Sequence, residues 1–241
     1  PDDARPEQIA CGVEHTLILT HTGTLFACGS NGYGRLGLGE SEDGESEDVP
    51  SAQLVPLPAG AEAAQVACGG RHTCVVTTSS ELLACGHNYH GQLGLGQGSA
   101  EEVHRLTAVP VPAPVKQVTC GWGHTCVLTV DGAVLTCGKN EHGQLGLNGV
   151  PTGLGEASFV LELRPVALPS EAAQIVCGWA QTFAVSAGGA LLGWGRNEDG
   201  QLGLGLRQSL PQPVPLPAGM GALRVASVGS GASASVFAVF G

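Results

Sequence analysis

Basic residues and aromatic rings are scarce in this chain of 241 residues. Lysine and arginine together number 10 against 21 aspartates and glutamates, and aromatic residues make up 4% of the chain. A nucleic-acid surface needs clustered positive charge to neutralise phosphates, and an anionic membrane surface needs the same. The basic residues here are scattered and the net charge is −11. The sequence therefore predicts no nucleic-acid or membrane partner, and a protein partner is easier to accommodate.

Long apolar runs are also missing. None approaches the roughly 18 residues of a membrane-spanning helix. The first residues do not combine a basic segment with an apolar one, so no secretory signal is predicted. No stretch combines convincing helical periodicity with capping residues, and the helix-like segment 170–176 falls at a strand position of the repeat described next. These absences favour an all-β fold built from short apolar strands.

A repeat is the dominant feature of what is present. The copies begin at Cys11, Cys68, Cys120 and Cys177, which are 57, 52 and 57 residues apart, and a degraded copy closes the chain from Val228. The 38 glycines fall in register with this period. Glycine and proline in such numbers indicate disorder when they lack a period, so here they indicate a repeated architecture.

The 9 cysteines follow the repeat. They recur at three positions, and at two of these other apolar residues take their place in other copies: Cys11, Cys68, Cys120 and Cys177 share one position, Cys28, Cys85 and Cys137 share the position of Trp194, and Cys74 and Cys126 share the position of Leu17 and Phe183. A thiol at such a position acts as a small hydrophobe. We therefore expect reduced core cysteines and a reducing compartment, the cytoplasm or the nucleus.

Each copy of roughly fifty residues predicts four short strands. In the third copy, residues 117–121 and 124–130 are strand candidates, Asp131-Gly132 is a hairpin turn, and 133–138 is the returning strand. Asp-Gly tolerates the positive φ that a tight turn demands. The proline-containing stretches 109–112 and 166–169 suit an edge strand, where a missing N–H does no harm.

Four strands per repeat are typical of a propeller blade. One such unit cannot bury both faces of its sheet, whereas stacked copies can. The sequence therefore predicts an all-β fold, a β-propeller built of repeated four-stranded blades, with four full repeats plus part of a fifth. We expect a single domain over 1–241, with repeats at about 8–64, 65–116, 117–173, 174–223 and a partial one at 224–241.

The most regular part of each copy is the element G-x-N-x-x-G-Q-L-G-L-G. Its glycines permit positive φ and close approach of backbones, and its asparagine can bond to its own turn. The expected structural residues are Gly29, Asn31, Gly34, Gly86, Asn88, Gly91, Gly138, Asn140, Gly143, Gly195, Asn197 and Gly200. A phosphate-binding loop would need Lys-Ser/Thr and a following helix, which the element lacks. We expect no cofactor.

These motifs resemble the repeats of the regulator-of-chromosome-condensation family. The resemblance covers about residues 8–241 and rests on CG-x-x-HT, DG-x-x-x-x-x-G and G-x-N-x-x-GQLGLG at fifty-odd residues. It implies a β-propeller, which in that family commonly has seven blades. This chain supplies four and part of a fifth, so a fragment, a partial propeller and a smaller ring all remain open. Family members serve as exchange factors for the small GTPase Ran, as scaffolds, beside ubiquitin ligase domains and as UV-B sensors, and a secretion-regulating exchange factor is also similar.

Two groups of residues are candidates for binding a partner. His15, His72 and His124 fill the HT position, and the resemblance implies that a histidine of this motif can face a GTPase. The alternative is a structural histidine bonded to neighbouring backbone. The segment from Glu40 to Asp48 holds six acids, which can dock a basic surface or form a solvated loop: Glu40, Glu42, Asp43, Glu45, Glu47 and Asp48.

Two further features interrupt the repeat. The irregular segment 148–166 contains Phe159, which we expect in the core rather than as an exposed anchor. Trp122 and Trp179 follow the CG of adjacent copies, where inter-blade packing is expected. The arginine that would accompany such a tryptophan in the plant photoreceptor is absent. His72 and Cys74 share a strand face, but no second ligand pair follows at zinc-finger spacing, so no metal is expected.

The sequence thus predicts a non-catalytic protein–protein interaction propeller. No arrangement of nucleophile, base and acid can be singled out, so no enzymatic activity of its own is expected. The alternative is a guanine nucleotide exchange factor for a Ran-like or other small GTPase. Exchange needs tighter binding of the nucleotide-free GTPase, not catalytic side chains. The partner's identity and the oligomeric state stay open at this stage.

Overall fold

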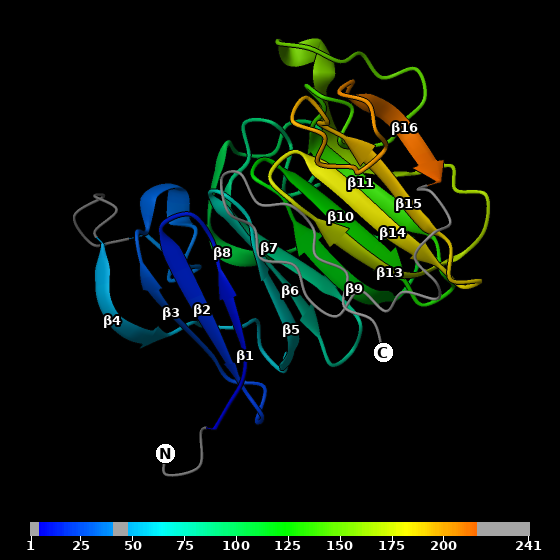
Figure 1. Ribbon diagram of the computed structural model, residues 1–241. Coiled ribbons are helices and arrows are strands. Elements are labelled where there is room, and N and C mark those ends of the chain that lie inside the picture. Colours follow the sequence, from blue (N-terminus) through cyan, green and yellow to red (C-terminus); the bar gives the residue numbers. More distant parts are fainter. Residues whose placement is uncertain (1–4, 41–47, 216–241) are drawn as a thin grey trace.

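The computed structural model describes residues 5–40 and 48–215, so the partial fifth repeat lies outside the described residues. Sixteen strands form four antiparallel sheets, each made of four consecutive strands, as the repeat predicted (Figure 1). We call the sheets blades 1 to 4: β1 Pro6–Cys11, β2 His15–Thr20, β3 Leu25–Gly29, β4 Val49–Leu54; β5 Ala63–Cys68, β6 His72–Thr77, β7 Leu82–His87, β8 Glu102–Ala108; β9 Val115–Cys120, β10 His124–Thr129, β11 Val134–Lys139, β12 Phe159–Pro165; β13 Ala172–Cys177, β14 Gln181–Ser186, β15 Leu191–Gly195, β16 Leu210–Pro215. The expected strand within 170–176 is β13.

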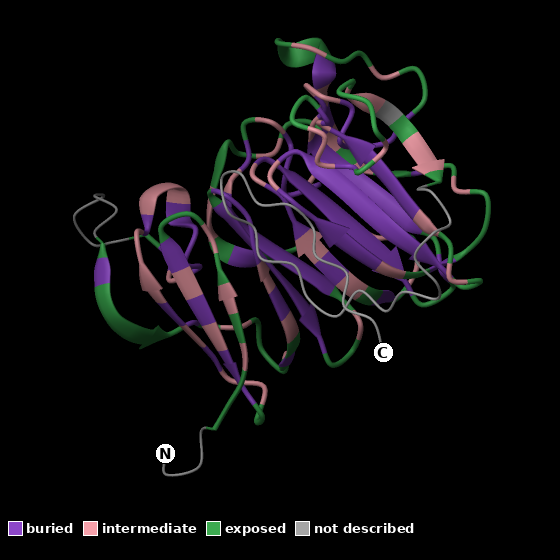
Figure 2. Ribbon diagram, in the orientation of Figure 1, coloured by how far each residue is buried: buried purple, intermediate pink, exposed green. Residues whose placement is uncertain are grey.

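The second strand of blades 2, 3 and 4 is buried on both of its faces. In β6 every residue is buried, although alternate side chains point to opposite sides of the sheet. Val75 packs into the core shared with blade 1, whereas Cys74 and Val76 pack into the core shared with blade 3. Figure 2 shows this burial in the middle strands of blades 3 and 4. A strand covered on both sides explains why the repeat carries continuous apolar runs.

Three apolar cores lie between successive blades. The core between blades 3 and 4, for example, joins Leu128 and Leu145 of one sheet to Ile175 and Trp194 of the next. Seven of the nine cysteines are buried, which agrees with their predicted packing role, while Cys11 is exposed and Cys28 is intermediate. Each blade therefore buries a face against every described neighbour, and the stack is one structure rather than four independent sheets.

Glutamine side chains tie the first strands of neighbouring blades together. The Gln65 amide donates to the Val118 carbonyl at 3.3 Å and accepts from the Val118 N–H at 3.0 Å. The same two bonds recur at the other junctions, from Gln8 to Val66 and from Gln117 to Ile175. One side-chain amide thus satisfies both backbone groups of a residue on the next inner strand.

A second inter-blade link explains why cysteine and tryptophan alternate at one position. In blade 4 the Trp194 indole donates to the Gln144 carbonyl of blade 3 at 3.0 Å. At the preceding junction the Cys137 thiol approaches the Gln92 carbonyl at 3.6 Å. Both side chains are apolar groups with one donor, so they fill the same place and meet the same acceptor.

The turn after each third strand is held by its asparagine. The Asn140 side-chain oxygen accepts from the Leu145 N–H at 3.1 Å, and the other three copies contain the same bond. Gly138 has φ 104°, and a Cβ there would lie 2.5 Å from the Gly123 carbonyl oxygen. The repeated glycine is therefore fixed both by its backbone conformation and by the close approach of a neighbouring turn.

The predicted position of the outer strand is wrong. The proline-containing stretches 109–112 and 166–169 follow the outer strands β8 and β12, which end at Ala108 and Pro165. The outer strand faces solvent and pairs through its backbone, so its side chains carry little apolar pattern. The pairing of β8 with β7 ends at the bond from the Val109 N–H to the Leu82 carbonyl, at 2.9 Å. The side chain of Val109 is buried in the core.

Helices are confined to two short 3-10 turns within the described residues, at Gly32–Gly34 and Glu156–Ser158. Across that part of the chain, no helix has the length and apolar character needed to cross a bilayer.

Candidate functional site

The histidines of the HT motif lie between blades. All three are buried, and each begins the second strand of its blade. In each case Nε2 lies within hydrogen-bond distance of a threonine hydroxyl of the next blade: His15 and Thr73 at 3.1 Å, His72 and Thr125 at 2.9 Å, and His124 and Thr182 at 3.0 Å. Gln181 takes the position in blade 4 and is also buried. These histidines lie buried at the contacts between neighbouring blades.

The threonine fixes the protonation of the histidine. The Thr125 hydroxyl donates its hydrogen to the Gln92 carbonyl at 2.6 Å, so it accepts from His72 and the His72 hydrogen sits on Nε2. His72 Nδ1 has no hydrogen-bond partner and lies against Gly69, where a Cβ would be 2.4 Å away. The HT, CG and GQLG motifs thus meet at one junction.

Burial keeps His15 and His72 neutral. It lowers the pKa of His72 to about 3, with a smaller contribution from the neighbouring histidines. Burial also lowers the pKa of His15 to about 4, and the Arg35 guanidinium adds to this effect. A proton on either ring would leave a charge in an apolar interface, which is costly. The bonds of His15 and His72 to the threonine hydroxyls therefore belong to the neutral rings at pH 7.

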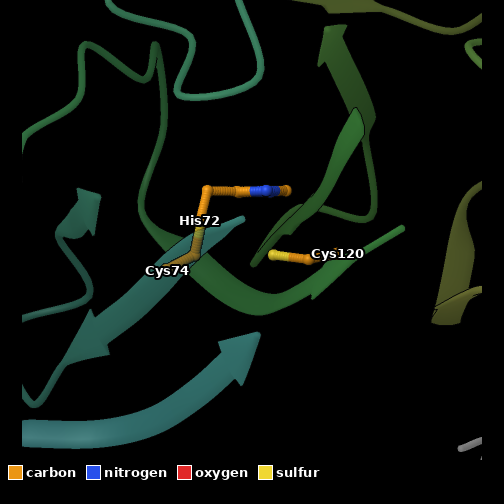
Figure 3. Close-up of side chains that lie close together, drawn as sticks. All are labelled: His72, Cys74 and Cys120. Atoms are coloured by element: carbon orange, nitrogen blue, oxygen red, sulfur yellow. The ribbon is translucent and has the colours of Figure 1, made fainter. Parts of the chain in front are cut away.

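One cluster has the composition of a soft-metal site. Donor atoms of His72, Cys74 and Cys120 lie within 4.8 Å of one another and are buried, with two residues on β6 and one on β9 (Figure 3). However, His72 Nε2 already donates its hydrogen to the Thr125 hydroxyl. Burial also raises the pKa of the Cys120 thiol well above its usual value, which disfavours the thiolate that binds a metal. The Cys120 thiol also faces the Ala67 carbonyl at 3.8 Å. These neutral contacts account for the cluster as inter-blade packing.

The acidic segment is described only at its two ends. Glu40 and Asp48 are exposed, and Glu42, Asp43, Glu45 and Glu47 lie outside the described residues. Glu40 lines a shallow groove together with Glu102 and His104 of the outer strand β8. The exposed ends are compatible with docking of a basic surface.

Aromatic rings gather on one edge of the stack, a feature that the sequence did not predict. Ring centroids 4.6–6.3 Å apart connect all four blades, and we call this set the aromatic rim: Tyr33, His87, Tyr89, His90, Trp122, His142, Phe159 and Trp179. In an antiparallel blade, the loops after the first and third strands lie at the same edge. Most of the rings follow those strands, His87 is the last residue of the third strand β7, and Phe159 begins a fourth strand at the same edge.

Basic side chains stack on these rings. The Arg71 guanidinium lies 5.2 Å from the Tyr33 centroid, the Lys139 ammonium 5.3 Å from Trp122, and the Arg196 guanidinium 5.4 Å from Trp179. Arg35 also lies over Tyr33. Four of the ten basic residues therefore meet on one edge, one from each blade, although they are scattered in sequence. Such cation–π contacts contribute about 0.5–2 kcal/mol each and hold both partners in place.

Acidic residues balance and orient the cations of the rim. Lys139 pairs with Glu141, and Arg196 pairs with both Glu198 at 3.2 Å and Asp199 at 3.1 Å. The ring of His90 stays neutral, since burial and then the Lys139 charge lower its pKa to about 4. The rim therefore presents ordered rings and paired charges, a composition typical of the energetic centre of a protein interface.

The two tryptophans meet across the junction between blades 3 and 4. Their ring centroids are 6.1 Å apart, and the backbone N–H of Trp122 donates to the backbone carbonyl of Trp179 across the junction at 2.9 Å. Both side chains are partly exposed. Phe159 was expected in the core, and it is instead half-buried beside Tyr89 at a ring distance of 5.8 Å. A useful signal was present in the sequence, since most of these rings fall directly after the CG or GxN motifs.

Four antiparallel four-stranded blades that share cores in series define a β-propeller. A family model described as an RCC1-like domain matches residues 2–238. The chain belongs to this family, as the repeat motifs had indicated.

Relatives within the family carry different functions. The chain is 37% identical over 204 residues to the ultraviolet-B receptor UVR8 of Arabidopsis thaliana, an alignment that covers 83% of this chain and 43% of that protein. It is 39% identical over 180 residues to the secretion-regulating guanine nucleotide exchange factor of Mus musculus, with coverage of 71% and 35%. The solved structure of human WBSCR16 is similar at a TM-score of 0.80 and 27% identity, covering 95% of this chain and 58% of that one. The chain thus spans less than two thirds of each of these proteins.

Proposed function

We propose that the chain is a non-catalytic protein-interaction propeller whose partner binds at the aromatic rim. The observation that supports this most is the continuous set of rings, on which basic side chains of blades 2, 3 and 4 stack at or near the surface. Tryptophan, tyrosine and arginine dominate the binding energy of protein interfaces. Here they come from loops on rigid sheets, so little conformational entropy is lost on binding.

The acidic segment has a separate part in this proposal. Glu40 is exposed beside the outer strand of blade 2, Asp48 is exposed directly before β4, and the sequence between them holds four more acids. Such a cluster accelerates encounter with a basic partner surface more than it strengthens the final complex. The buried histidines His15, His72 and His124 support the rim from inside, since they set the angle between the blades that carry it.

The proposal is tested by comparing the partners of rim variants. The wild-type chain, Trp122→Ala and Trp179→Ala would be used for cross-linking and mass spectrometry in cell extract, and each captured protein would then be purified and titrated against the chain. Val130→Ala is the matched control, because Val130 is 62% exposed at the opposite edge of blade 3. We expect a direct partner whose affinity falls by about tenfold or more in the rim variants. Equal binding by all four chains would refute the rim as the binding surface.

Guanine nucleotide exchange is the second candidate function. It is supported by the 39% identity to the secretion-regulating exchange factor, over 71% of this chain. Such an activity requires no catalytic side chain, because a GTPase that binds more tightly without nucleotide releases GDP faster. A partner of this kind would place the chain in the cytoplasm or the nucleus.

The exchange proposal is tested by release of fluorescent GDP from purified Ran and from a panel of small GTPases. Acceleration by orders of magnitude for one GTPase, and its loss in Trp179→Ala, would support exchange through the rim. A cooperative melting transition of the same sample shows that the chain is folded. Unchanged release with a folded chain would exclude exchange for that panel and leave the interaction function.

A further inference from the structure

A groove lies beside the aromatic rim between blades 2 and 3. Its volume is about 430 Å³, and one side comes from the turn after β7 while the other comes from the irregular segment and β12. The lining residues are Tyr89, Gln97, Glu101, Glu156, Phe159, Leu161, Glu162 and Arg164. The groove therefore uses residues that do not recur between blades.

Two aromatic rings, those of Tyr89 and Phe159, line one wall of the groove. Tyr89 is 45% exposed, and its ring meets the edge of Phe159 with centroids 5.8 Å apart. His90 packs on Phe159 from behind at 4.6 Å, and the Tyr89 hydroxyl reaches Glu156 at 3.4 Å. Two rings are thus held in position in the lining of the groove. Such a wall attracts a cation through the negative face of each ring.

The remaining polar lining is acidic. Glu101, Glu156 and Glu162 are exposed carboxylates, and Arg164 is the single basic residue among the lining side chains. Arg164 lies 3.3 Å from Glu162, so one carboxylate is neutralised. Two negative charges remain uncompensated by cations of the groove itself. The chain as a whole carries a net charge of −11, which adds to the attraction for a cation.

Backbone bonds hold the two sides of the groove at a fixed distance. The Gly96 N–H bonds the Leu161 carbonyl at 2.8 Å, and Leu95 forms an isolated β-bridge with Glu162. A Cβ at Gly91 would lie 2.4 Å from the Leu161 Cα, so the turn packs directly on β12. The groove is preformed, and a ligand would not have to order it.

The same place between blades 1 and 2 shows what is particular to this groove. There the bridge joins Leu38 to Arg105, and strand register puts Glu102 at the position of Phe159. In the turn, Gly32 stands one residue after the repeat asparagine, where blade 2 has Tyr89. That groove has carboxylates at Glu40 and Glu102 but lacks the two rings. The junction between blades 2 and 3 therefore pairs an aromatic wall with an acidic lining, whereas the junction between blades 1 and 2 does not.

We propose that this groove binds a lysine or arginine side chain of an extended peptide from a protein partner. The cation would lie against the Tyr89 and Phe159 rings, with Glu101 and Glu156 as counter-charges. Its aliphatic stem would run along Leu161, in the way that long basic side chains cover apolar surface. The inference rests on the proposed interaction function, and it adds the chemistry of the segment that is recognised.

The test uses a short fluorescein-labelled peptide of alternating lysine and glycine, titrated against the full 241-residue chain by fluorescence anisotropy. The norleucine counterpart of the peptide keeps the stems and removes the charges. We expect binding of the lysine peptide alone, with affinity reduced about tenfold in Tyr89→Ala. The double variant Glu101→Gln/Glu156→Gln is expected to bind several-fold more weakly and to lose part of the salt dependence.

The matched control is Glu62→Gln/Glu171→Gln, which removes the same charge from two exposed positions in the loops before β5 and β13, at the edge of the blades opposite the groove. It should bind the lysine peptide as the wild type does, and the melting temperature of every variant is recorded to show that each is folded. Equal affinity of wild type and Tyr89→Ala, equal weakening by the two charge variants, or no binding of the peptide would each overturn the inference. None of these outcomes touches the rim proposal, whose own variants are Trp122→Ala and Trp179→Ala.

Discussion

His72 of blade 2 donates its Nε2 hydrogen to the Thr125 hydroxyl of blade 3 across 2.9 Å, and Thr125 passes its own hydrogen to the Gln92 carbonyl. This relay joins two blades through groups that are all buried. His72→Ala removes the donor and leaves a void in the interface, so we expect a loss of about 2–4 kcal/mol of unfolding free energy. His72→Gln retains a donor, as Gln181 does in blade 4, and should lose less. Urea unfolding followed by tryptophan fluorescence measures both variants, and equal losses would refute the relay.

The stability of the chain should fall in mild acid. The unfolded histidine binds a proton below about pH 6.5, whereas the folded rings of His15 and His72 bind one only near pH 4 and pH 3. Between these limits the unfolded state holds more protons, so each histidine removes about 1.4 kcal/mol of stability per unit of falling pH. Urea unfolding from pH 7 to pH 4 measures this slope. The double variant His15→Gln/His72→Gln should show a flatter slope, and an unchanged slope would assign the effect to other groups.

The glutamine link between inner strands gives another prediction. Gln65→Ala leaves the Val118 N–H and carbonyl without their side-chain partner at a largely buried junction. The expected cost is about 1–3 kcal/mol. Gln53→Ala is the control, because Gln53 is exposed on the outer strand β4, where substitutions change stability by about 0.5 kcal/mol or less. Equal melting temperatures for these two variants would contradict the role assigned to Gln65.

The Gln144 carbonyl accepts hydrogen bonds from both Trp194 and Thr182 at the junction between blades 3 and 4, and substitutions of these two donors measure what each bond contributes. Trp194→Phe keeps a large ring in the core and removes the N–H that donates to the Gln144 carbonyl. We expect a loss of about 1–3 kcal/mol from the lost bond and imperfect packing. The Thr182 hydroxyl also donates to this carbonyl, so the double variant with Thr182→Val measures coupling between the two donors. Strict additivity would show that the two bonds act independently.

Thiol reactivity should follow burial. Cys11 is exposed and Cys28 is partly exposed, whereas burial raises the pKa of Cys85 and Cys137 well above its usual value. The thiolate is the reactive form. Iodoacetamide applied to the native chain should therefore modify Cys11 first and Cys28 more slowly. Peptide mass spectrometry locates the labels, and rapid labelling of Cys85 in the folded chain would show that the junction opens.

Much of the fold could be predicted from the sequence because the same pattern of strands and turns recurs in four copies. Positions such as Asn140 and Gly138 recur with the period, so their structural role was visible without coordinates. The outer strands were misplaced because their solvent-facing residues carry little apolar pattern, and the conspicuous prolines after Val109 attracted the prediction instead. Apolar periodicity reports side-chain burial and says less about backbone pairing.

The aromatic rim could not be predicted in the same way. Tyr33, His90 and Trp179 lie far apart in sequence, and their proximity depends on how blades are stacked. Phe159 was assigned to the core because a large ring in an irregular segment is more often buried. Its place in a groove depends on Tyr89 of another repeat, a neighbour that no local pattern indicates. What distinguishes one blade from the next is therefore the least predictable part of the chain.

The links between blades also bear on how such a chain arises. Blades 1 to 3 each carry the histidine and glutamine that bond to the next blade, and blades 2 to 4 each carry the threonine and backbone groups that bond to the preceding one. A duplicated gene segment that encodes one blade therefore brings both halves of the junction with it. The added unit fits at either side without compensating substitutions elsewhere. Copy number can thus change in evolution by whole blades, while loops at the edge diverge freely to acquire new partners.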